Sequence, residues 1–145
     1  MFKKILLPVD GSSTSNQAIE KTMAMAEAFK SQVTVVSVID NYAFTGVGVD
    51  FAYGQTEYLK AAMAEANASL NAVKQLFEAR GIPVGSKLVE GHAAYKGILD
   101  TAQSTGADLI VMGSHSHQGL KKLLLGSVAA QVLSHAHLPV MIVRE

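Results

Sequence analysis

The sequence alternates between two hydrophobic patterns along its whole length. Short segments rich in apolar and β-branched residues occupy positions 2–9, 33–39, 84–90, 108–113 and 139–143. Between them, apolar residues recur three and four positions apart over residues 14–30, 56–80, 93–105 and 127–135. The first pattern is typical of strands buried on both faces, and the second of amphipathic helices. The alternation predicts an α/β fold with a parallel sheet and helices on both of its faces.

Size and composition exclude several classes of protein. With 145 residues and no linker or repeat, we expect one domain over residues 1–145. The absence of cysteine excludes a disulfide scaffold, a zinc finger, a cysteine nucleophile and iron–sulfur ligation. Twelve basic residues balance twelve acidic ones, which argues against binding to nucleic acid or acidic membranes and fits self-association. Without a span of about 18 apolar residues or a signal-peptide core, the expected location is the cytoplasm.

The end of the first predicted strand carries a candidate ligand contact. In open parallel sheets, ligands bind beyond the carboxyl ends of the strands, where the strand order reverses. The first strand ends in Pro8-Val9-Asp10 and is followed by Gly11-Ser12. Asp10 could contact Mg²⁺ or recognise a polar group of a ligand. Alternatively, it forms an Asx turn at the start of the next helix.

The end of the fourth predicted strand is rich in glycine and serine. Glycines at positions 113, 119 and 126 could bring the backbone close to a ligand and adopt positive φ angles. Ser127 is a suitable N-cap, and the N–H groups that follow Gly126 would form an anion site. This pattern predicts a phosphate-binding loop to which Ser114, Ser116 and Ser127 add hydroxyl groups. The alternative is that the glycines only build turns and Ser127 only caps a helix.

Two other features have weaker implications. The pairs His115/His117 and His135/His137 lack the i,i+4 spacing of a helical metal site, and no cysteine could complete such a site. We therefore expect no metal at either pair. Residues 40–55 combine glycines and aromatics without a helical or strand period, which predicts a long loop. A loop of this length could close over the site as a lid.

Three segments resemble the universal stress protein family: ILLPVDGSSTSNQAI, ADLIVMGSHSHQGLKKLLLGSVAAQVL and HLPVMIVRE. The resemblance extends over nearly the whole chain. It implies a three-layer, Rossmann-like α/β/α fold whose five-stranded parallel sheet has the order 3-2-1-4-5. It also implies a homodimer formed through the last strand, Pro139, Val140, Met141, Ile142 and Val143.

One branch of this family binds ATP through a glycine pattern: Gly, two residues, Gly, nine residues, then Gly and Ser or Thr. Gly113 matches the first position and Gly126-Ser127 the last pair, whereas Ser116 stands at the middle glycine. The resemblance implies that the chain binds ATP, ADP or AMP, with Mg²⁺ at Asp10. The nucleotide contacts that it implies are Pro8, Val9, Asp10, Val38, Met112, Gly113, Ser114, His115, Ser116, Gly126, Ser127, Val128 and Ala129.

The resemblance also implies a role for each part of this set. Pro8, Val9 and Asp10 would line the adenosine and metal side, and the backbone of Val38 would meet the adenine. Met112 and Gly113 would pack near the ribose and phosphates. The backbone N–H groups of residues 127–129 would bind phosphate.

Three functions remain open from the sequence. The first is an ATP-binding regulatory protein that acts in the stress response as a dimer. The second is a stress protein of the same fold that binds no nucleotide and works through protein contacts, which Ser116 and the missing hydroxyl at Ala129 favour. The third is a slow ATPase, with only Asp10, His115 and His117 as candidate general bases and no catalytic constellation.

Overall fold

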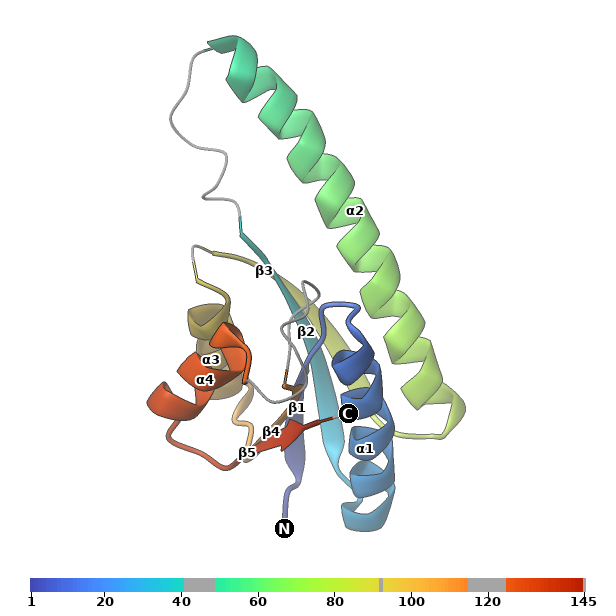
Figure 1. Ribbon diagram of the computed structural model, residues 1–145. Coiled ribbons are helices and arrows are strands. Elements are labelled where there is room, and N and C mark those ends of the chain that lie inside the picture. Colours follow the sequence, from blue (N-terminus) through green and yellow to red (C-terminus); the bar gives the residue numbers. More distant parts are fainter. Residues whose placement is uncertain (41–48, 92, 115–124, 145) are drawn as a thin grey trace.

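The computed structural model contains a five-stranded sheet with helices on both faces (Figure 1). It describes residues 1–40, 49–91, 93–114 and 125–144, with the backbone alone at residues 13, 40 and 49–56. The elements in chain order are β1 (Lys4–Pro8), α1 (Ser13–Phe29), β2 (Gln32–Asp40), α2 (Val49–Ala79), β3 (Val84–Gly91), α3 (Ala94–Thr105), β4 (Leu109–Gly113), α4 (Ser127–His135) and β5 (Val140–Val143).

The sheet is parallel throughout, and its order is β3-β2-β1-β4-β5. Helices α1 and α2 cover one face, and α3 and α4 cover the other (Figure 1). The predicted fold class and strand order are therefore confirmed. The order reverses at β1, because β2 and β3 lie on one side of it and β4 and β5 on the other. In the described part of the chain, every helix is too short or too polar to cross a bilayer.

Two hydrophobic cores hold the layers together, one on each face of the sheet. In β1, Ile5 and Leu7 belong to the core beneath α1 and α2, whereas Leu6 belongs to the core beneath α3 and α4. All three side chains are at most 1% exposed. Burial on both faces explains why the strand is a continuous apolar run rather than an alternating one.

One sequence prediction about the fold is wrong. Residues 40–55 were expected to form a long loop, but Asp40 ends β2 and α2 begins at Val49. Residues 49–55 are therefore helical, although Gly54 and the aromatic residues there disfavour a helix. Once the strong apolar stripe beyond residue 56 has formed a helix, extending that helix by another turn avoids the free-energy cost of nucleating a new one. The remainder of the expected loop and lid, residues 41–48, lies outside the described residues.

Candidate functional site

A pocket opens at the carboxyl edge of the sheet, where the strand order reverses. The empty space within it, counted together with its opening to solvent, is about 550 Å³. The last residues of β1 and β4 form its base, because these strands are neighbours and run in the same direction. The first turns of α1, α3 and α4 surround it.

The turn between β1 and α1 fixes Asp10 at the pocket. Gly11 has a φ of +82°, a left-handed conformation that favours glycine, and it reverses the chain at this point. The N–H of Ser12 then donates to Oδ1 of Asp10 at 3.0 Å, which is the predicted Asx turn. Asp10 nevertheless lines the pocket. The two alternatives for Asp10 are therefore compatible, since one carboxylate oxygen can hold the turn while the group faces the pocket.

The first turn of α1 adds a hydroxyl group to the pocket. Ser12 is the N-cap, and its Oγ accepts from the N–H of Ser15 at 3.2 Å. Ser15, only 3% exposed, lines the pocket, and its Oγ lies 3.4 Å from the backbone nitrogen of Asp10, which donates to it. A serine hydroxyl that accepts one bond can still donate its own proton. Ser15 can therefore offer a hydrogen bond to a ligand.

Gly113, at the end of β4, is required by packing. A Cβ at this position would lie 2.5 Å from Oγ1 of Thr14, 2.7 Å from its carbonyl carbon and 2.8 Å from the nitrogen of Ser15. The first turn of α1 thus lies directly against Gly113. The expectation of a positive φ at this glycine is wrong, because the positive-φ glycines of the described chain are Gly11, Gly81 and Gly106.

The start of α4 is held at the pocket by backbone hydrogen bonds. The N–H of Ser114 donates to the carbonyl of Val143 at 2.9 Å, and the N–H of Gly126 donates to the carbonyl of Ser114 at 2.7 Å. Gly126 is the N-cap of α4, with φ −63° and ψ 158°. Two expectations are therefore wrong: Ser127 is the first residue of the helix rather than its cap, and Gly126 does not have a positive φ.

The N-terminus of α4 provides positive potential at the pocket. The N-cap Gly126 offers no side chain to cap this end, and the first turn contains no acidic residue. The first backbone hydrogen bond to the cap is made by the N–H of Ala130, which donates to the carbonyl of Gly126 at 2.9 Å. The N–H groups of residues 127–129 have no partner within the helix. Because Val128 and Ala129 line the pocket, an anion there would meet these donors and the helix dipole.

The opposite part of the pocket is apolar. Val36 and Val38 project from β2, and Ala94 and Ile98 face them from α3. The two valines are two residues apart on one strand and therefore share a face. The pocket thus combines an apolar end between β2 and α3 with a polar end formed by Asp10, Ser15 and the start of α4. This combination suits a ligand with a flat apolar ring at one end and an anionic group at the other.

Most of the residues predicted from the sequence meet in this pocket. Ser114, Gly126 and Ser127 do not line it, but the first two hold the start of α4 in place. His115 and Ser116, like Gly119, lie outside the described residues. The predicted residues that line the pocket are Pro8, Val9, Asp10, Val38, Met112, Gly113, Val128 and Ala129.

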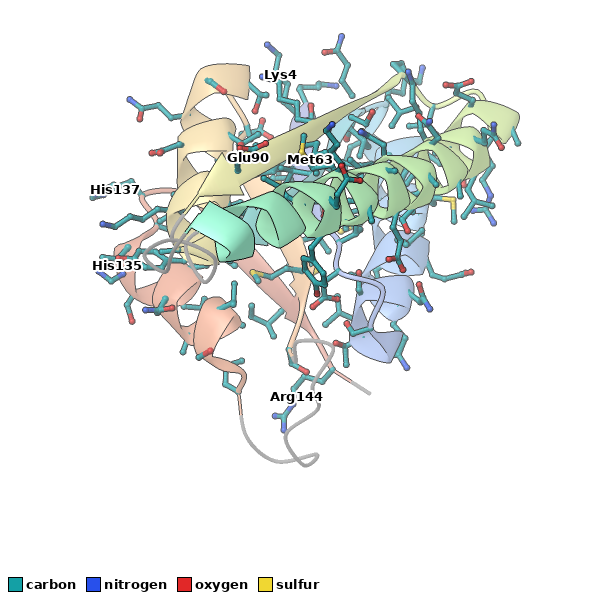
Figure 2. All side chains as sticks on the ribbon, turned by 90° about the horizontal axis from the view of Figure 1, so that it is seen from above. Lys4, Met63, Glu90, His135, His137 and Arg144 are labelled. Carbon is teal, nitrogen blue, oxygen red and sulfur yellow. The ribbon has the colours of Figure 1, made fainter. Side chains whose placement is uncertain are left out.

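The second pair of histidines lies elsewhere. Figure 2 shows His135 and His137 on the outer side of the molecule near the end of α4, pointing away from the sheet. Nδ1 of His135 lies 2.9 Å from the carbonyl oxygen of Gln131 and donates to it. Among the residues with described side chains, no three His, Asp or Glu residues are grouped so that they could hold a metal ion.

Sequence reasoning missed four residues that line the pocket: Ser15, Val36, Ala94 and Ile98. Val36 could have been found, because it lies two positions before Val38 and strand residues at this spacing share a face. Ser15 could have been found from the N-cap at Ser12, which places position 15 in the first helical turn. No sequence signal indicates that Ala94 and Ile98 reach the site, since this depends on how α3 lies against the sheet.

Comparisons with known proteins assign the family. Residues 1–144 match the universal stress protein family. The chain is 35% identical to the universal stress protein MJ0531 of Methanocaldococcus jannaschii, over 100% of this chain and 84% of that protein. It also resembles the solved structure of MJ0577 from the same organism, with a TM-score of 0.90 and 30% identity over 100% of this chain and 97% of that one. This chain belongs to the universal stress protein family.

A more distant structure shares the fold and contains a nucleotide. It is a universal stress protein in complex with cAMP, which matches with a TM-score of 0.72 and 22% identity over 99% of this chain and 97% of that one. At 22% identity, this structural similarity establishes a shared fold and does not extend to the ligand.

Proposed function

We propose that this chain is an adenine nucleotide-binding regulatory protein of the stress response, which binds ATP and Mg²⁺ and acts in the cytoplasm as a homodimer of single-domain subunits. The observation that carries the proposal is the pocket between the ends of β1 and β4. Its apolar residues and the first turn of α4 line this one pocket. The cAMP complex of a distant relative with the same fold supports an adenine nucleotide as the ligand.

The residues present fit the two ends of ATP. Val36, Val38 and Ile98 would contact the base, because apolar side chains suit a flat aromatic ring. The N–H groups of residues 127–129 would bind the phosphates, whose negative charge is favoured by the helix dipole. Ser15 and Asp10, which line the polar end together with the start of α4, could meet sugar hydroxyls or the first phosphate.

Asp10 is the residue that would contact Mg²⁺. Magnesium sites in nucleotide-binding proteins commonly use one or two carboxylates together with the phosphates of the ligand and retained waters. A carboxylate next to phosphates would repel them unless a cation lies between. The carboxylate of Asp10 at the pocket therefore favours binding of the magnesium complex over free ATP.

Thermal unfolding tests the proposed ligand. The protein, stripped of bound nucleotide, should melt at a higher temperature in the presence of Mg-ATP, because a ligand that binds only the folded state stabilises it. At about a hundred times its Kd, ATP would add about 2.7 kcal/mol. For a chain of this size we expect Tm to rise by about 5–10 °C.

GTP serves as the control ligand, since it carries the same phosphates on a more polar base. A smaller shift with GTP would support recognition of adenine at the apolar end. No shift at millimolar Mg-ATP would contradict the proposal. The function would then be sought in protein contacts, the second possibility raised by the sequence.

The proposed dimer interface is the edge of β5. This strand lies at one end of the sheet, and among the described strands only β4 pairs with it, on one side. Met141 on this strand is 37% exposed, and Leu133 on α4 is 44% exposed. Apolar side chains beside an open strand edge favour association with a second strand.

Replacing Met141 with lysine should weaken the dimer at least about tenfold, because the interface would have to bury an unpaired charge. Sedimentation velocity over a range of concentrations would measure the change. Leu76→Lys is the matched control, since Leu76 is 52% exposed on α2, which packs against β2 and β3. A monomeric wild-type protein, or a Met141→Lys variant that dimerises like the wild type, would refute this interface.

A further inference from the structure

Gly97 of α3 allows Val38 to occupy its position in the pocket wall. A Cβ added at Gly97 would lie 3.0 Å from Cγ2 and 3.1 Å from Cγ1 of Val38, and 3.4 Å from Cγ1 of Val89. Gly97 is buried on the same face of α3 as Ile98. The helix therefore lies so close to β2 at this point that an alanine would require Val38 or the helix to shift by a few tenths of an ångström.

Rotating Val38 about χ1 would relieve only part of the contact. Both of its methyl groups would touch the added Cβ, so the new atom would lie between them. A rotation about χ1 leaves one methyl group in this position. The contact is fully relieved only if Val38 moves away from α3 or if α3 moves away from β2.

Either movement changes the apolar end of the pocket. Val38 lines this end from β2, and Ala94 and Ile98 line it from α3. A shift of Val38 away from Gly97 displaces the first wall. A shift of α3 displaces the second, because Ala94 and Ile98 lie within one helical turn of Gly97.

We propose that Gly97 is a positioning residue that sets the width of the apolar end through Val38, and that this width determines how tightly the base of the nucleotide is bound. This inference rests on the proposed function and extends it to a residue that does not line the pocket. Gly97 acts through Val38, so changing Val38 should suppress the effect of changing Gly97.

The test is a double-mutant cycle with Gly97→Ala and Val38→Ala, measured by calorimetric titration with Mg-ATP. Gly97→Ala should weaken ATP binding about tenfold, because it displaces the methyl groups of Val38 that line the pocket. A mismatch of one methyl group in an apolar pocket changes affinity by about this factor or more. In the Val38→Ala background, the same change should alter affinity less than about twofold, because the methyl groups that it would contact are gone. Urea unfolding of the wild type, the two single variants and the double variant shows whether a change in affinity merely follows a change in stability.

Gly85→Ala is the control for adding a methyl group elsewhere on the sheet, because a Cβ there meets no atom within 4 Å. It should bind ATP like the wild type. Alanine favours a helix over glycine, which offsets part of the crowding and should keep Gly97→Ala folded. A Gly97→Ala variant that does not fold would make Gly97 a requirement of the fold and would overturn the inference.

The outcomes are distinct. Unchanged affinity in Gly97→Ala would overturn the inference, and so would a tenfold loss that persists in the Val38→Ala background. A double variant that cannot fold would make Gly97 a requirement of the fold and would also overturn it. Absence of ATP binding in the wild type would refute the proposed function itself, and this is seen before any variant is made.

Discussion

Replacing Gly113 with alanine is expected to destabilise the protein by about 3 kcal/mol, the upper part of the usual range for overpacking. The Tm should fall by about 6–12 °C for a chain of this size. The same change should weaken ATP binding, because the first turn of α1 must move and this turn carries Ser15 into the pocket.

The size of this effect follows from what the new Cβ would meet. Two of the three nearest atoms, the carbonyl carbon of Thr14 at 2.7 Å and the nitrogen of Ser15 at 2.8 Å, belong to the backbone. Backbone atoms cannot rotate away as the end of a flexible side chain can. The helix must therefore shift, and the cap at Ser12 and the Asx turn at Asp10 would shift with it.

Gly91→Ala is the matched control for Gly113→Ala. Each glycine is the last residue of its strand, β3 or β4, but a Cβ on Gly91 would meet no described atom within 4 Å. Gly91→Ala should change stability by no more than about 0.5 kcal/mol. Urea unfolding measures both variants. Equal stabilities of the two variants would mean that α1 and β4 are not packed as closely as described.

Gly113 also shows what a sequence motif can and cannot establish. The glycine pattern correctly marked the end of β4 as an important position, but the expected reason was a positive φ near a ligand. The structure gives a different reason, which is the close approach of α1 to β4. Contact between these two elements connects residues about 100 positions apart, and no local pattern contains that information.

The fold itself was predictable because each strand is buried on both faces. Runs such as Ile5-Leu6-Leu7 have no polar face, so they require helices above and below them. The start of α2 was not predictable in this way. Residues 49–55 lack a helical apolar stripe, and they are helical because they continue a long helix.

The two ends of the pocket also differed in whether the sequence could predict them. Its polar end could be located, because Asp10 lies just after β1 and Gly113 ends β4, and a parallel sheet brings the ends of these strands to one edge. Ala94 and Ile98 at its apolar end could not, because their place depends on the distance between α3 and β2. At Gly97 the absence of a Cβ lets α3 lie close to Val38 of β2. Helix-to-sheet distance is a property of packing that hydrophobic periodicity does not encode.

Replacing Ser127 with proline should weaken Mg-ATP binding at least about tenfold, because a hydrogen bond from this N–H to a charged phosphate is worth about 1.5–3 kcal/mol. Proline removes the N–H of the first helical residue, where it has no partner within the helix. The fold should persist, since Gly126 has a ψ of 158° and this extended conformation is favoured before proline. Calorimetric titration measures the affinity.

Ser127→Ala separates the backbone donor from the side chain. It removes the hydroxyl but keeps the N–H, so its affinity for Mg-ATP should stay within about threefold of the wild type. Equal losses in both variants would assign the contact to the hydroxyl. Wild-type affinity in both would place the phosphates away from the start of α4. A loss confined to Ser127→Pro would mean that binding relies on the backbone of α4, which any residue except proline supplies. Departures from the family's side-chain pattern at Ser116 and Ala129 would then be compatible with a working site.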